Sequence, residues 1–199
     1  MDYPYPSRNK SFLYLFFGIK RRFRRKDYLK NAKIIAKMIN DSTKTIKAYW
    51  FFTPYTIPDK ELLSLLNQDR HEIALHVASD PYAEWKILEN ETNRTVQYFT
   101  MHGTERVFAQ LLWGRRIGEK RIDMPADFPL KCFQDDAEFR TYSLDRIRFQ
   151  LGFEKARVEV AAWIRQGFIV SMHPEWLFKK GPARGPFYDV LKAILESEP

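Results

Sequence analysis

Cysteine is almost absent from this chain: Cys132 is the only one among 199 residues. A single thiol cannot form a disulfide within the chain, and the two-cysteine spacing of a zinc finger or ribbon does not occur. This cysteine usage is typical of a protein from a reducing compartment, or of one indifferent to redox conditions. We therefore expect a cytoplasmic protein.

Long hydrophobic runs are also missing. The longest early apolar segment, residues 12–19, is far shorter than the roughly 20 residues that a transmembrane helix needs. The chain opens with Asp2, Tyr3 and two prolines, unlike the basic start and apolar stretch of a secretory signal peptide. We expect neither a transmembrane segment nor a signal peptide.

Apolar and aromatic residues, by contrast, are plentiful. Hydrophobic residues make up 45% of the chain and aromatic residues 16%, which excludes intrinsic disorder and supplies a sizeable core. With no internal repeat or low-complexity tract, the length suits a single domain over residues 1–199. Most aromatic side chains are expected in that core, and two or three are left to stack on sugar rings.

Positive charge is concentrated near the N-terminus. The formal net charge is +8, and much of the excess lies in one run, Lys20–Lys26. This run forms either a solvated helix face or a surface for anionic partners, and together with residues 12–19 it resembles an interfacial anchor for peripheral attachment to a membrane. Only Phe23 interleaves with the basic residues, so we do not expect nucleic acid as a partner.

Strand-like and helix-like segments alternate from residue 28 onward, which indicates βαβ units and a mostly parallel sheet. Helical spacing of apolar residues predicts helices over residues 28–40, 59–66, 82–90, 105–112, 153–164 and 188–195. Short apolar runs predict strands over residues 46–52, 72–77, 95–101, 130–133 and 168–172. Residues 114–127 have the composition of a basic loop, and residues 134–148 fit no element.

Three of the four histidines lie at the carboxyl ends of predicted strands. His76, His102 and His173 each lie at the carboxyl end of a strand, whereas His71 precedes its strand. Ligands of parallel α/β folds gather at these ends, so the histidines mark a candidate site.

His76 and Asp80 are the most suggestive pair. They stand four residues apart at a junction between a strand and a helix, and imidazole and carboxylate are both good ligands of divalent metals. Asp80 also directly precedes Pro81, which is typical of an ordinary helix N-cap. Both interpretations stay open at this point.

The segment HEIALHVASDP, residues 71–81, resembles the second motif of the polysaccharide deacetylase (NodB-homology) family, GHEIGxHxxxHP, whose last two histidines bind a metal. His76 matches the first ligand, Asp80 stands in place of the second, and His71 matches a histidine that is not a ligand. The segment IVSMHP, residues 169–174, resembles the last motif, a strand that ends in Leu-His. Thr100 stands where the family has an arginine. The resemblance covers about residues 28–195.

The resemblance implies an α/β fold, an incomplete or distorted (β/α)7-type barrel with mostly parallel strands. It also implies that the first strand and its first aspartate are missing upstream. Asp2 would then be the remaining aspartate of the first motif, and residues 1–27 an aromatic and basic N-terminal segment.

For function, the resemblance implies a metal-dependent deacetylase acting on an N-acetylated sugar or a related amide. Asp2, His76 and Asp80 would hold a divalent metal, expected to be zinc. His173 would protonate the departing amine, His102 is a second candidate catalytic residue, and Trp176 is a candidate floor for the sugar. The missing aspartate, Asp80 and Thr100 favour an alternative: a non-catalytic descendant that binds carbohydrate or serves as a scaffold.

Overall fold

The computed structural model describes residues 29–54, 56–78, 80–101, 124–133, 141–172, 174, 177, 185 and 187–196. Its main sheet has four strands in the order β1 (Ala48–Phe52), β2 (His71–Val77), β3 (Tyr98–Met101) and β4 (Lys131–Cys132). The described residues of Trp50–Ile57 and Ile73–Cys132 form one compact unit, and the remaining described residues form a second. The expected α/β class with mostly parallel strands is confirmed, since β2 pairs with β3, and β3 with β4, in parallel.

The first unit is built on a βαβ crossover. Helix α3 (Pro81–Thr92) connects β2 to β3, and these two strands pair in the register Leu75↔Phe99. Asp80 begins the helix, because its carboxylate accepts a hydrogen bond from the backbone N–H of Ala83 at 3.1 Å. Asn93 ends it in the left-handed conformation, with φ at 51°, which asparagine tolerates better than most residues.

An aromatic cluster packs α3 onto this sheet. Phe128 meets Tyr82 and Trp85 of α3 and Phe99 of β3 edge to face, with ring centroids 5.2, 6.1 and 5.3 Å apart. Such pairs contribute roughly 0.5–1.5 kcal/mol each beyond the apolar area that they bury. The cluster thereby holds the helix that follows His76 against the strand next to His76.

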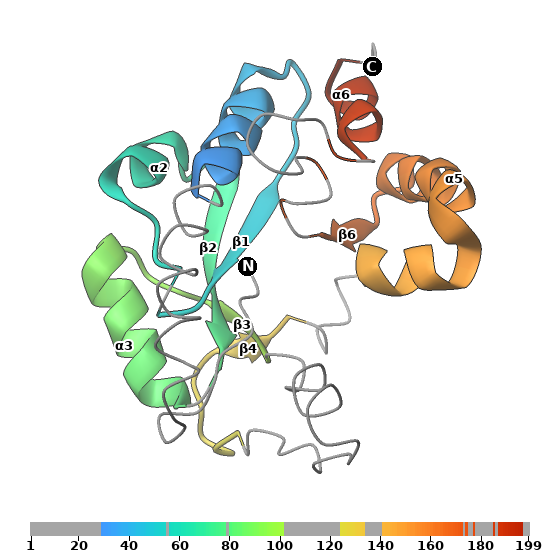
Figure 1. The fold of residues 1–199 in the computed structure, drawn as a ribbon. Coiled ribbons are helices and arrows are strands. Elements are labelled where there is room, and N and C mark those ends of the chain that lie inside the picture. The colour runs from blue at the N-terminus through green and yellow to red at the C-terminus, as the bar shows by residue number, and fades with distance from the viewer. Residues whose placement is uncertain are drawn as a thin grey trace, which may run out of the picture. The chain divides into compact units, whose positions relative to one another are not determined.

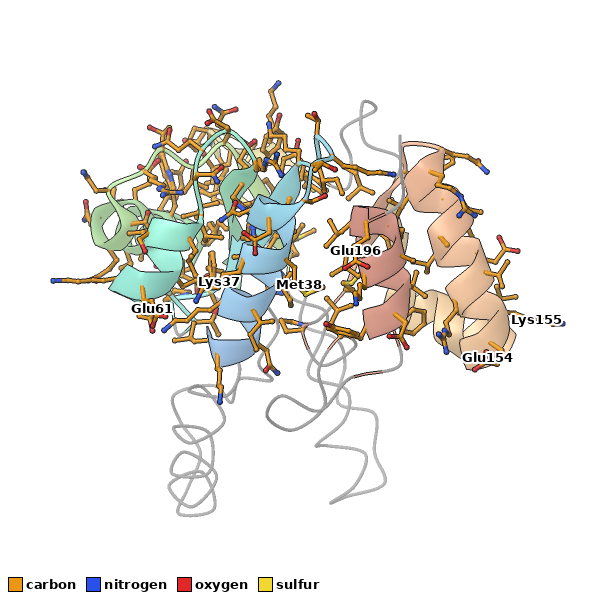
Figure 2. All side chains as sticks on the ribbon, turned by 90° about the horizontal axis from the view of Figure 1, so that it is seen from above. Lys37, Met38, Glu61, Glu154, Lys155 and Glu196 are labelled. Carbon is orange, nitrogen blue, oxygen red and sulfur yellow. The ribbon has the colours of Figure 1, made fainter. Side chains whose placement is uncertain are left out.

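The second unit contains a helix over residues 29–41 and the short helix α2 (Lys60–Leu65). The buried residues Ala32, Ile35, Ala36 and Ile39 recur at helical spacing, so the first of these helices has one apolar face. Lys33 on that helix pairs with Asp59, the N-cap of α2, at 2.8 Å and with Glu61, which Figure 2 labels on α2. The hydrogen bonds to these two carboxylates raise the pKa of Lys33, and the bond to Asp59 has the larger effect.

A second βαβ arrangement also belongs to this unit. Strands β5 (Thr141–Ser143) and β6 (Ile169–Ser171) pair in parallel and are joined by α5 (Leu144–Arg165), which packs on α6 (Tyr188–Glu196) in Figure 1. Val160 of α5 and Ile194 of α6 are buried, whereas Glu154 and Lys155 point away from α6 in Figure 2. Ser42, after the helix of residues 29–41, donates a hydrogen bond to the Leu195 carbonyl at 2.8 Å and ties α6 to that helix.

Several predicted boundaries differ from those in the structure. The range of α5 contains two helices on either side of a kink at Gly152, whose φ of 74° and ψ of 170° are not helical. The helix predicted over residues 153–164 corresponds to the second of them, and the first, from Leu144, was not predicted. Strand β3 begins at Tyr98 rather than at residue 95. Strand β5 falls in a stretch that fitted no predicted element. His71 is the first residue of β2 and does not precede it.

Other expectations fall partly outside the described residues. These include the predicted helix over residues 105–112, most of the expected loop over residues 114–127, and the N-terminal segment of residues 1–27. Within the part of the chain that is described, no helix is both long and apolar enough to cross a bilayer.

Candidate functional site

His76 is the centre of the candidate site. It is the penultimate residue of β2, near the carboxyl end of a parallel strand, and only 6% of its surface is exposed. Successive side chains of a strand point to opposite faces, so His76 lies on the face opposite the buried Leu75 and Val77. Its ring nitrogen Nδ1 lies 2.7 Å from the hydroxyl oxygen of Thr100.

Thr100 is a residue of the candidate site whose contact with His76 the sequence analysis did not predict. It is the register partner of His76 on β3, so the parallel ladder sets the two side chains next to each other. From the sequence, Thr100 was visible only as the replacement of an arginine in the family pattern. The pairing register that brings it to His76 could not be read from either strand alone, although both residues lie near the ends of adjacent predicted strands.

Asp80 lies exposed at the start of α3. Its Oδ1 accepts the hydrogen bond from Ala83, so the N-cap interpretation describes what this carboxylate does in the structure. A carboxylate has two oxygens and several acceptor positions, so capping through one oxygen is compatible with ligation through the other.

Glu84 holds the loop between His76 and Asp80. It is buried, and its Oε2 accepts a hydrogen bond from the Ala78 N–H at 2.7 Å while Oε1 lies 3.4 Å from the Asp80 N–H. Charge-assisted hydrogen bonds of this kind are stronger than neutral ones, so the loop after β2 is firmly anchored. The sequence signal was faint, because the glutamate of an ordinary capping box stands three residues after the N-cap and Glu84 stands four after it.

The remaining predicted site residues lie outside the described part of the chain; they are Asp2, His102, His173, Trp176 and the basic run Lys20–Lys26. Among the described residues, no three His, Cys, Asp or Glu side chains gather closely enough to hold a metal ion. That finding does not cover the expected set of Asp2, His76 and Asp80, because Asp2 is not described.

His71 belongs to a different environment in the second unit. Only 1% of its surface is exposed, and its Nε2 lies 2.9 Å from Oδ1 of Asn40. The Asn40 amide nitrogen donates to the Leu65 carbonyl at 2.8 Å, so Oδ1 is the acceptor and His71 Nε2 carries the hydrogen. His71 thus ties β2 to the helix of residues 29–41.

The second unit also contains a partly buried ion pair. Lys47 on the approach to β1 lies 2.8 Å from Oε2 of Glu72 on β2, and this hydrogen bond raises the pKa of Lys47. The other carboxylate oxygen of Glu72 is buried and has no hydrogen-bond partner within the described residues. The pair joins the segment before β1 to β2.

Comparisons with protein-family models, with curated proteins and with solved structures found no match for this chain.

Proposed function

We propose that this chain is a metal-dependent, deacetylase-like hydrolase related to the polysaccharide deacetylases, with an N-acetylated sugar or a related amide as substrate. The observation that carries the proposal is the setting of His76: a buried imidazole at the carboxyl end of a parallel strand, held by Thr100 of the next strand. Ligand sites of parallel α/β folds lie at this end of the sheet. The parallel strands β2, β3 and β4, with the α3 crossover, are also compatible with part of an incomplete (β/α)7-type barrel.

The donor groups suit a divalent metal, for which zinc is our first choice. Metal-binding histidines commonly use their second ring nitrogen to hold an oxygen atom of the protein, as His76 does with Thr100. Asp80 retains an oxygen beyond the one that caps α3, and Asp2 would complete the set. A metal held there would supply a Lewis acid that polarises the amide carbonyl and activates water.

The other proposed roles belong to residues beyond the described part of the chain. His173 would donate a proton to the departing amine, which suits an imidazole because its pKa is close to neutrality. His102 is the second proposed acid–base residue, and Trp176 would stack on the sugar ring. These roles follow from the resemblance of residues 169–174 and from the positions of the two histidines after predicted strands.

A second candidate is a non-catalytic, carbohydrate-binding or scaffold descendant that attaches to anionic surfaces through Lys20–Lys26. Two observations favour it. Asp80 is exposed and already uses one oxygen as a helix cap, and Thr100 offers a neutral hydroxyl where the family has a charged arginine.

Zinc titration followed by calorimetry, together with acetate release from chitooligosaccharides, separates the two candidates. The hydrolase should bind zinc and release acetate, and His76→Ala should abolish both. Gln97→Ala, which alters an exposed side chain just before β3, should change neither. Far-UV circular dichroism verifies that each variant is folded. Oligosaccharide binding without acetate release would select the second candidate, and a wild-type chain that binds no zinc would refute the metal hydrolase.

A further inference from the structure

The buried carboxylate of Glu84 does more than anchor the start of α3. We propose that Glu84 is a positioning residue, which fixes the loop after β2 and thereby holds Asp80 in one conformation as a preformed metal ligand. The inference rests on the proposed function for the identity of the ligand as a metal. The fixed loop is a property of the metal-free chain, and it can be tested without a metal.

Glu84 connects both ends of the loop to the helix. Strand β2 ends at Val77 and α3 begins at Pro81, so the loop consists of residues 78–80. Oε2 of Glu84 accepts a hydrogen bond from the Ala78 N–H at 2.7 Å, and Oε1 accepts a longer one from the Asp80 N–H at 3.4 Å. Only 4% of Glu84 is exposed, so water competes little for this carboxylate. One side chain thus fixes the first and the last residue of the loop.

Asp80 is held through its backbone and through its side chain. Its N–H donates to the Glu84 carboxylate, and its carbonyl accepts from the Glu84 N–H at 3.0 Å. Its Oδ1 accepts from the Ala83 N–H at 3.1 Å, which restricts rotation of the side chain. Asp80 is exposed, so a cation can reach its second oxygen, Oδ2, from solvent. A ligand held in this way loses little conformational freedom when it binds, which favours affinity.

The negative charge of Glu84 is a second way in which this residue could favour a cation. Asp80 and Glu84 stand four residues apart, and like charges at this spacing repel each other. A divalent cation bound to Asp80 would relieve that repulsion. Position and charge therefore act in the same direction, and the test has to separate them.

The test combines amide hydrogen exchange of the metal-free protein with zinc calorimetry. Glu84→Gln removes the charge and leaves a single acceptor oxygen, whereas Glu84→Asp keeps the charge on a side chain that is one methylene too short to reach the loop. Both variants should speed exchange at the Ala78 amide about 10-fold and weaken zinc binding about 10- to 100-fold. Thr92→Ala, which removes a hydroxyl hydrogen bond at the far end of α3, should lower the stability of the helix and leave the zinc affinity unchanged.

The outcomes separate the inference from the proposed function. A Glu84→Asp protein with wild-type exchange and wild-type zinc affinity would overturn positioning, because charge alone would then suffice. Faster exchange with unchanged zinc affinity would overturn it too, as would an equal loss of affinity in Thr92→Ala. If both Glu84 variants speed exchange at Ala78 but no protein binds zinc, wild type included, the fixed loop is upheld and the proposed function fails.

Discussion

Replacing Asn40 by alanine should destabilise the second unit, mainly because it removes the acceptor of one buried donor, the Nε2–H of His71. Asn40 accepts hydrogen bonds from His71 Nε2 at 2.9 Å and from the Asn67 amide at 2.7 Å, and it donates to the Leu65 carbonyl at 2.8 Å. His71 is 1% exposed, so its Nε2–H would lose the Asn40 acceptor at a position where water cannot take its place, at a cost of about 1–3 kcal/mol. The exposed Asn67 amide can turn to water at little cost.

Loss of the hydrogen bond from Asn40 to the Leu65 carbonyl adds a cost of roughly 0.5–1.5 kcal/mol, the usual contribution of one ordinary hydrogen bond. The expected loss in the free energy of unfolding is therefore about 1.5–4.5 kcal/mol, which for a chain of this size lowers Tm by roughly 3–18 °C. Urea unfolding followed by far-UV circular dichroism measures the change. Gln68→Ala, at an exposed neighbouring position, is the control and should stay within about 0.5 kcal/mol of wild type.

A double-mutant cycle with His71→Leu isolates the critical contact. If the orphaned imidazole causes most of the loss, Asn40→Ala should cost about 1–2 kcal/mol less in the His71→Leu background, since no buried N–H then remains to be left unpaired. An Asn40→Ala protein as stable as the Gln68→Ala control, or a cycle with no coupling, would refute the assignment of His71 Nε2 as a donor to Asn40.

Three further predictions follow from other contacts. Glu84→Gln should destabilise the protein by about 1–3 kcal/mol and speed hydrogen exchange at the Ala78 amide, since the charge-assisted bonds are lost; unchanged exchange there would contradict the anchored loop. Leu62→Ala should cost about 2–5 kcal/mol in urea unfolding, because Leu62 is fully buried; a loss below 1 kcal/mol, well under that range, would contradict its core position. The hydrogen bond to Glu72 raises the pKa of Lys47 in the folded state. Its contribution to the free energy of unfolding is under about 1 kcal/mol, because the lysine is half-exposed. That contribution is complete below the unfolded pKa of about 10.4 and is lost as pH rises through the folded value. The stability difference between wild type and Lys47→Met should therefore shrink above about pH 10, and a difference that grows there would contradict the pairing.

Much of the first half of the fold was predictable because its signals are local. Apolar residues recur every three or four positions along the helix over residues 29–41, and β2 contains the buried apolar residues Ile73, Ala74, Leu75 and Val77. Asp80 precedes α3 and caps it, which is one of the two interpretations that its position before Pro81 left open. These features depend on neighbouring residues alone, so the sequence was sufficient.

The features that the sequence did not reveal depend on tertiary pairing. Strand β5 has three residues and is defined by its parallel partner β6, since Thr-Tyr-Ser has no distinct apolar pattern of its own. The contact of His76 with Thr100 requires the register of β2 against β3. Glu84 gave only a faint signal, because its role depends on how the loop after β2 turns back onto the helix. Of the candidate site, His76 and Asp80 were found from their spacing, and the residues that hold them in place were not.

The most direct test of the central claim is anomalous diffraction from crystals of the full chain soaked with zinc. The account predicts a peak about 2.0–2.1 Å from Nε2 of His76, the distance of a zinc–imidazole bond, with carboxylate oxygens of Asp80 and Asp2 as further ligands. Crystals in which zinc binds elsewhere while His76 stays unliganded, or in which Asp2 lies far from His76, would contradict it.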